Sequence, residues 1–213
     1  ERPEQLVLSR LDLVPPGLED VVVDVEWSGI STGTERLLWS GQMPMFPGMG
    51  YPLVPGYESV GRISQAGEAA SSRVGERVFV PGARCFGSVR GLFGGAASRL
   101  VVPAARALPI EESLGEKGVL LALAATARHA IAEGHRQPDL IVGHGVLGRL
   151  LARIVVATGG PPPTVWERNP DRAGGADGYA VVDPASDARQ DYRAIYDVSG
   201  DPSLLDSLVA RLA

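Results

Sequence analysis

Residues 139–148 join a short apolar run to a glycine-rich turn and the start of a helical pattern. The apolar residues at 140–142 indicate a buried parallel strand, and those at 150, 151, 154 and 155 recur at helical spacing. The glycines between them stand as G-x-G-x-x-G. This order predicts a dinucleotide-binding βαβ unit, because the helix offers free N–H groups and its positive end to a pyrophosphate. A glycine turn that binds nothing is the alternative.

Each glycine of the turn has an expected role. Gly143 permits the tight turn, Gly145 lets the backbone approach the phosphates, and Gly148 lets the helix pack close to the sheet. The residues expected to contact the cofactor here are Gly143, His144, Gly145, Val146, Leu147 and Gly148. The pattern leaves two alternatives for the His144 ring, which are contact with the pyrophosphate and exposure to solvent.

The strand after the turn is expected at Thr164–Trp166, and Glu167 follows it, 19 residues after Gly148. An acidic residue near this spacing accepts the ribose hydroxyls of the adenosine half, which favours NAD over NADP. Arg168 is also a cofactor-binding candidate, and it weakens the preference because an arginine can meet a 2′-phosphate. NAD is the predicted cofactor.

Composition excludes several classes of function. The net charge is −5 and no basic run is present, so no nucleic-acid partner is expected. No apolar stretch reaches the roughly 18 residues of a membrane span, so no stable membrane insertion is expected. The single cysteine, Cys85, permits no internal disulfide and no multi-cysteine zinc site. A reducing cytoplasm is the expected location.

The composition and the apolar pattern of the chain change near residue 110. Residues 1–109 are rich in glycine, proline and short alternating runs, which indicate a small β-barrel or sandwich. Its expected strands are Val21–Trp27, Ser59–Ile63, Arg77–Val80 and Arg99–Val102. Residues 110–213 alternate helix and strand, which predicts a doubly wound sheet. Beyond the glycine turn its expected elements are a helix at Val119–Glu133, a strand at Ala194–Val198 and a helix at Leu204–Leu212.

This arrangement resembles the medium-chain dehydrogenase/reductase superfamily along nearly the whole chain. The segments that carry the likeness are Gly29–Glu35, Val54–Glu58 and Gly75–Val78, together with the glycine turn. The resemblance implies an α/β chain with a β-rich part, in which a GroES-like barrel (1–109) precedes a Rossmann-type domain (110–213). It also implies that the cofactor sheet continues through further strands beyond residue 213.

Within the superfamily, the chain is most similar to the bacteriochlorophyllide a dehydrogenase family. The similar segments are Ser28–Glu35, Trp39–Gly41, Pro47–Glu58, Arg90–Ala96, Leu121–Ala130, Asp139–Arg153 and Asp191–Asp197. The resemblance implies an enzyme of bacteriochlorophyll biosynthesis that oxidises the 3-(1-hydroxyethyl) group of a bacteriochlorophyllide to 3-acetyl with NAD. The alternatives are a zinc-free quinone or enone reductase and a non-catalytic pigment-binding subunit.

Zinc members of the superfamily hold the metal through cysteine and histidine, but the corresponding positions here carry Ser31 and Tyr57. Hydroxyls are poor zinc ligands, so no metal is expected. The expected catalytic residues are Tyr57, Ser31, Thr34 and Glu58, and Glu35 is expected to fix the loop. The alternatives are that Tyr57 only packs and that Glu58 only satisfies buried N–H groups.

Residues 37–57 contain no charged side chain and hold all three methionines. Methionine adapts to irregular shapes and contacts aromatic faces well, which suits a flat tetrapyrrole. The expected substrate contacts are Trp39, Met43, Met45, Phe46 and Met49. The alternative is a loop that merely covers the barrel core. A homodimer and transient contact with the photosynthetic membrane are both compatible with the resemblance.

Overall fold

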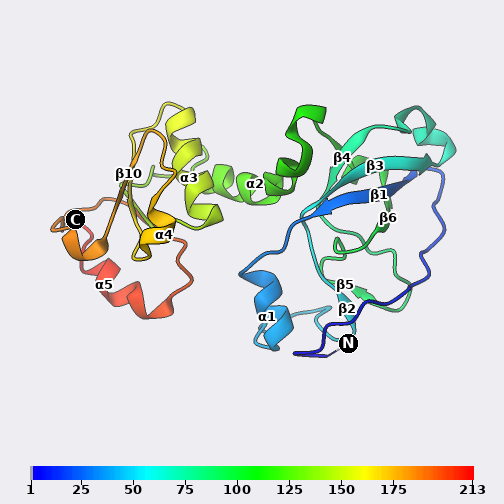
Figure 1. The fold of residues 1–213 in the computed structure, drawn as a ribbon, viewed down its shortest axis with the longest axis horizontal. Coiled ribbons are helices and arrows are strands. Elements are labelled where there is room, and N and C mark those ends of the chain that lie inside the picture. The colour runs from blue at the N-terminus through cyan, green and yellow to red at the C-terminus, as the bar shows by residue number, and fades with distance from the viewer. Residues whose placement is uncertain (1) are drawn as a thin grey trace. The chain divides into compact units, whose positions relative to one another are not determined.

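The computed structural model describes residues 2–213, which form two compact units that divide between Ala122 and Leu123. Figure 1 shows a β-rich first unit and an α/β second unit. The division lies later than the expected boundary at 109/110. Residues 110–120 belong to the first unit because the N–H of Ile110 donates to the carbonyl of Arg77 over 3.1 Å and Gly118 packs against Val60.

The first unit is built on an antiparallel sheet in the order β6-β1-β3-β4-β7, with a parallel two-stranded ladder of β2 and β5 beside it. Its strands are β1 (Asp20–Ser28), β2 (Leu53–Val54), β3 (Ser59–Ala66), β4 (Arg77–Val80), β5 (Arg90–Gly91), β6 (Arg99–Pro103) and β7 (Leu108–Pro109). Its helix α1 spans Thr34–Ser40, and 3₁₀ segments span Glu68–Arg73, Ala104–Arg106 and Glu112–Leu120. The four strands expected from alternation are confirmed as β1, β3, β4 and β6.

The core of this unit comes from β-branched and leucine side chains on the central strands. Val21, Val23, Val78 and Leu100 are fully buried. The pairing of β1 with β3 shifts register between Val22 and Val23 and again after Val25. Such bulges bend a strand and increase its twist, which curves the sheet around the core.

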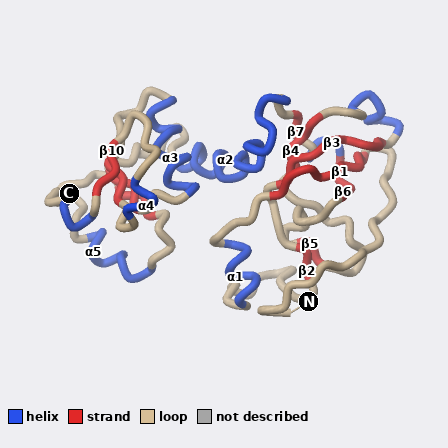
Figure 2. The backbone as a smooth tube through the Cα atoms, in the orientation of Figure 1, coloured by secondary structure: helices blue, strands red, loops and turns tan. Residues whose placement is uncertain are grey.

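Much of the first unit near α1, β2 and β5 is loop (Figure 2). The segment at 37–57, expected to be irregular, contributes its first residues to α1 and then runs as loop into β2. Gly41 ends α1 in the left-handed region at φ 73°, a conformation that favours glycine.

The second unit holds a parallel sheet in the order β10-β9-β8-β11. Its strands are β8 (Leu140–Val142), β9 (Thr164–Trp166), β10 (Ala180–Val182) and β11 (Ile195–Asp197). Its helices are α3 (Val146–Ala157), α4 (Pro170–Ala173) and α5 (Leu205–Val209), with 3₁₀ segments at Pro184–Ser186 and Pro202–Leu204; α2 (Leu121–Ala130) spans the division between the units.

Both faces of the parallel sheet are covered, as in a doubly wound fold. Ile141 packs with Leu151 and Val155 of α3 on one face. Leu140 packs with Trp166 and Leu208 on the other, where α5 lies. The fold class expected from the sequence is therefore confirmed.

Two helices are shorter than expected, and in the second unit neither β10 nor α4 was predicted. The helix expected at Val119–Glu133 is α2, which follows a 3₁₀ segment and ends at Ala130. The helix expected at Leu204–Leu212 is α5, which begins after a 3₁₀ turn capped by the Asp201 side chain. The helix α4 is a single turn of four residues, which is too short for a helical apolar periodicity to reveal.

Candidate functional site

The glycine turn between β8 and α3 has the geometry that its spacing predicts. Gly143 adopts φ 103°, and a Cβ placed at Gly148 would lie 1.9 Å from the carbonyl oxygen of Gly143. A Cβ at Gly145 would meet no heavy atom of the described residues within 4 Å. The turn thus requires glycine for conformation at 143 and for close packing at 148, whereas Gly145 faces open space beside the start of α3. Val146 and Leu147 form the first turn of that helix.

The Glu167 carboxylate lies at the end of β9 and is held beside this turn. Oε2 accepts a hydrogen bond from the backbone N–H of His144 over 3.1 Å, and Oε1 accepts one from the N–H of Asn169 over 2.8 Å. Burial alone would raise the pKa of Glu167, but these N–H donors together with the Arg172 charge leave the pKa below its ordinary value. Glu167 is therefore an ionised acceptor. Arg168 is exposed and faces Asp201 at 3.6 Å.

The His144 ring is fully buried, so the solvent-exposed alternative is wrong. Its Nδ1 lies 2.6 Å from the carbonyl oxygen of Arg172, and its Nε2 lies 2.8 Å from the Tyr179 hydroxyl. Neither partner could be foreseen, because both are about 30 residues away in sequence and neither lies in a motif. Burial lowers the pKa of His144, which favours the neutral ring.

In the first unit, a buried carboxyl group marks the second cluster of interest. Glu58 is 4% exposed, and no hydrogen-bond partner among residues 2–213 reaches its Oε1. A Cβ added at Gly29 would lie 2.1 Å from its Oε2, so the missing side chain at Gly29 leaves room for the carboxyl. The sequence left open the alternative that Glu58 satisfies buried N–H groups. The unpartnered Oε1 does not support it. The space that Gly29 leaves for the Glu58 carboxyl could not be predicted from the sequence, because the two residues are far apart in the chain.

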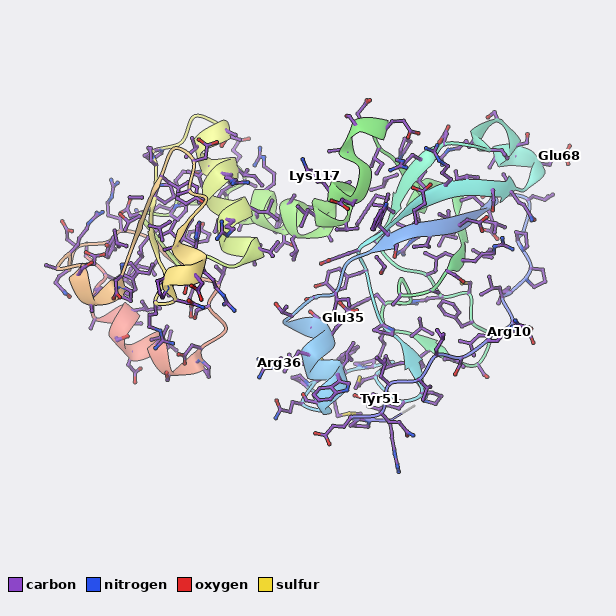
Figure 3. The ribbon with its side chains drawn as sticks, in the orientation of Figure 1. Arg10, Glu35, Arg36, Tyr51, Glu68 and Lys117 are labelled. Carbon is purple, nitrogen blue, oxygen red and sulfur yellow. The ribbon has the colours of Figure 1, made fainter. Side chains whose placement is uncertain are left out.

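The remaining polar groups of this cluster come from the loop after β1. The Ser31 N–H donates to the Glu35 carboxylate, and the Thr34 N–H donates to the Ser31 Oγ over 3.2 Å. The expectation that Glu35 fixes this loop is confirmed. Figure 3 shows Glu35 at the start of α1. Burial raises the pKa of Glu35, and burial together with the nearby Glu35 charge raises the pKa of Glu58.

Tyr57 is half-buried, and its ring meets the Phe93 ring edge to face with centroids 5.7 Å apart. Ser31 and Tyr57, the residues that the resemblance placed at metal-ligand positions, carry hydroxyls, and two hydroxyls are a donor set that does not fit zinc. Within residues 2–213, no group of three or more His, Cys, Asp or Glu side chains could hold a metal ion.

The uncharged segment at 37–57, which comprises the end of α1 and the loop after it, keeps much of its hydrophobic surface exposed. Met45 is 81% exposed, Trp39 52% and Phe46 39%, whereas Met43 and Met49 are half-buried. The loop is anchored at its far end, where the Tyr51 hydroxyl donates to the Leu38 carbonyl; Figure 3 labels Tyr51. A loop that merely covered the barrel core would bury these side chains, so the exposure favours a binding surface.

The antiparallel barrel, the parallel sheet and the glycine turn together define the class as a medium-chain dehydrogenase/reductase. Residues 17–112 match the alcohol dehydrogenase GroES-like domain. An alcohol dehydrogenase from Escherichia coli CFT073, solved with cofactor NADH, shares the fold with a TM-score of 0.76 and 24% identity over 100% of this chain and 72% of that one.

The chain belongs to the family of the 2-desacetyl-2-hydroxyethyl bacteriochlorophyllide A dehydrogenases. It is 58% identical over 217 residues to the protein of that name from Cereibacter sphaeroides, covering 99% of this chain and 68% of the relative. It is also 58% identical over 212 residues to its namesake from Rhodobacter capsulatus, with the same coverage. Among residues 2–213, no helix is both long enough and apolar enough to cross a membrane.

Proposed function

We propose that this protein oxidises the hydroxyethyl side chain of a bacteriochlorophyllide to an acetyl group in bacteriochlorophyll biosynthesis, with NAD as the hydride acceptor. The observation that carries the proposal is the 58% identity to two dehydrogenases named for this pigment, over 99% of the chain. Such a reaction needs a group that accepts a proton and a site for the hydride acceptor. The buried Glu58 carboxyl of the first unit and the glycine turn of the second unit suit these two roles.

The second unit fits a dinucleotide. The open space at Gly145 and the free N–H groups at the start of α3 suit a pyrophosphate, and the ionised Glu167 suits ribose hydroxyls. Gly143, His144, Val146, Leu147, Gly148 and Arg168 complete the proposed cofactor site. Bound NAD would accept the hydride from the carbinol carbon. The Escherichia coli structure with NADH supports a nicotinamide cofactor, and Glu167 supports the choice of NAD.

The first unit supplies the group that takes the proton. As the carbinol C–H bond gives its electron pair to the cofactor, the O–H bond breaks and the carbonyl forms, so one proton must be accepted. Glu58 suits this role because its Oε1 lacks a partner among the described residues and burial raises its pKa above the ordinary value. Tyr57, Ser31 and Thr34 are the hydroxyls that would relay the proton. The conjugated macrocycle attached to the carbinol carbon shares the positive charge that develops.

The pigment would lie against Trp39, Met43, Met45, Phe46 and Met49. We expect the double variant Met45→Ala/Phe46→Ala to bind bacteriochlorophyllide about tenfold or more weakly, because it removes exposed apolar area that the pigment would bury. NAD affinity should not change. Both affinities can be measured by fluorescence quenching. The matched control is Val74→Ala, an exposed apolar residue of the same unit outside the loop; equal pigment binding by both proteins would remove the loop from the substrate site.

We propose a cytoplasmic enzyme that contacts the photosynthetic membrane transiently, because its pigment substrate is hydrophobic. A homodimer is also proposed, following the pairing common among superfamily members through the edge of the cofactor sheet. Light scattering after size exclusion measures the mass directly, and a monomer at micromolar concentration would contradict the dimer.

The decisive assay mixes the protein, NAD and the hydroxyethyl bacteriochlorophyllide and follows the long-wavelength absorption band. A new carbonyl conjugated with the ring should move this band to the red, with one NADH formed per pigment converted. Omitting NAD is the control. Bound pigment that shows no shift would support a pigment-binding subunit, whereas turnover of a quinone with NADPH alone would support a reductase.

A further inference from the structure

The buried ring of His144 connects two segments of the second unit that both hold the Glu167 carboxylate. One segment is the glycine turn, to which His144 itself belongs. The other is α4, whose Arg172 carbonyl oxygen lies 2.6 Å from the ring Nδ1. Glu167 Oε2 binds the N–H of His144 on the first segment, and its Oε1 binds the N–H of Asn169, which caps the second. The hydrogen bond from the ring therefore joins the two segments that contact the Glu167 carboxylate.

The hydrogen-bond chemistry fixes the state of the ring. A carbonyl oxygen only accepts, so Nδ1 carries the proton and donates to Arg172. In the neutral ring, Nε2 then accepts from the Tyr179 hydroxyl, 2.8 Å away. Both ring nitrogens are thus used, and the Tyr179 ring packs edge to face on the imidazole with centroids 5.6 Å apart.

Arg149 of α3 reinforces the same connection from the helix side. Its Nε donates to the His144 carbonyl over 3.0 Å, and its Nη2 donates to the Arg172 carbonyl over 2.7 Å. The backbone N–H, the carbonyl and the side chain of His144 are all engaged. A residue at the second position of a glycine turn needs none of these contacts to make the turn, so they point to a separate task.

We propose that His144 is a positioning residue that holds the Glu167 carboxylate for the ribose of the adenosine half, and so sets the discrimination between NAD and NADP. The inference rests on the proposed nucleotide site. With the ring removed, Arg149 still links the turn to α4, but the carboxylate between them is held less firmly. A free 2′-hydroxyl then loses its acceptor, while a 2′-phosphate meets less repulsion.

The test compares variants of the full chain by their dissociation constants for NAD and NADP. His144→Ala should weaken NAD binding about tenfold and NADP binding less, because the Glu167 carboxylate loses the support that the ring gives to the turn and to α4. His144→Asn places an amide near the Nδ1 position and should restore most of the NAD-to-NADP ratio. His144→Gln reaches toward Tyr179 instead and should not restore it. His129→Asn, an exposed histidine of α2, is the matched control.

An unchanged NAD-to-NADP ratio in a folded His144→Ala protein would overturn the inference. Should that variant fail to fold by circular dichroism, the Asn and Gln variants decide, and equal ratios for these two would overturn it as well. Wild-type protein that binds neither NAD nor NADP would instead refute the nucleotide site on which the inference rests.

Discussion

Replacing Glu58 by glutamine is expected to reduce turnover by about a hundredfold or more and, at the same time, to stabilise the folded protein at neutral pH. Turnover falls because the amide cannot accept the alcohol proton, and acid–base groups contribute about 10²–10⁴-fold to such rates. Stability rises because the wild-type carboxyl is buried beside Glu35 with an unpartnered oxygen. The measurements are kcat at saturating NAD and the thermal midpoint at several pH values.

The direction of the pH dependence follows from the raised pKa of Glu58. A carboxyl whose pKa is higher in the folded than in the unfolded protein favours folding below its unfolded pKa. It loses that contribution as the pH rises through its folded value. The wild-type midpoint should therefore fall more steeply than that of Glu58→Gln as the pH rises through the folded pKa of Glu58. The rate kcat/KM should rise with pH over the same interval, since the base must be deprotonated.

Tyr57→Phe separates the two candidates for the proton acceptor, because it keeps the Glu58 carboxyl and removes only a hydroxyl. We expect it to lower turnover less than Glu58→Gln does. Full turnover in Glu58→Gln together with a large loss in Tyr57→Phe would transfer the role to the tyrosine. A lower midpoint in Glu58→Gln at pH 7 would mean that the carboxyl stabilises the fold, which would contradict a destabilising role for its unpartnered oxygen.

Local patterns account for what the sequence predicted well. The glycine turn, β8, β9 and the central barrel strands depend on apolar periodicity and on backbone conformations that only nearby residues determine. The cluster of Ser31, Thr34 and Glu35 is likewise one short segment at the start of α1, and its internal hydrogen bonds span three or four residues. Such features need no knowledge of distant contacts.

The features that escaped sequence analysis depend on residues far apart in the chain. The room that Gly29 leaves for Glu58 and the partners of His144 exist only once strands and loops are assembled. The exposure of Met45 and Trp39 could not be predicted from the sequence either, because an uncharged segment can equally cover a core or face outward. Apolar periodicity predicts which face of a helix or strand is buried. Which distant side chains contact that face depends on how the elements pack together.

Two glycine-to-alanine variants should separate the nucleotide function of the turn from its structural role. Gly145 has φ −73° and ψ −169°, which alanine adopts readily, and its new Cβ meets no heavy atom of the described residues within 4 Å. Gly145→Ala should therefore fold normally, yet bind NAD at least about tenfold more weakly, because the methyl group occupies the space that the pyrophosphate needs. Gly148→Ala should lower both the stability of the fold and the affinity for NAD, since its Cβ would lie 1.9 Å from the Gly143 carbonyl oxygen.

The cost of Gly148→Ala should be roughly 1–3 kcal/mol in the free energy of unfolding, as expected for overpacking against backbone that cannot yield locally. This outweighs the gain of about 1 kcal/mol that alanine usually brings within a helix. Thermal denaturation and NAD titration of both variants measure the two effects. Gly174→Ala, at φ −72° with open space around its Cβ, is the control for an added methyl group outside the turn. Wild-type NAD affinity in Gly145→Ala would show that the pyrophosphate does not approach this turn, because nothing but bound nucleotide would contact that methyl group.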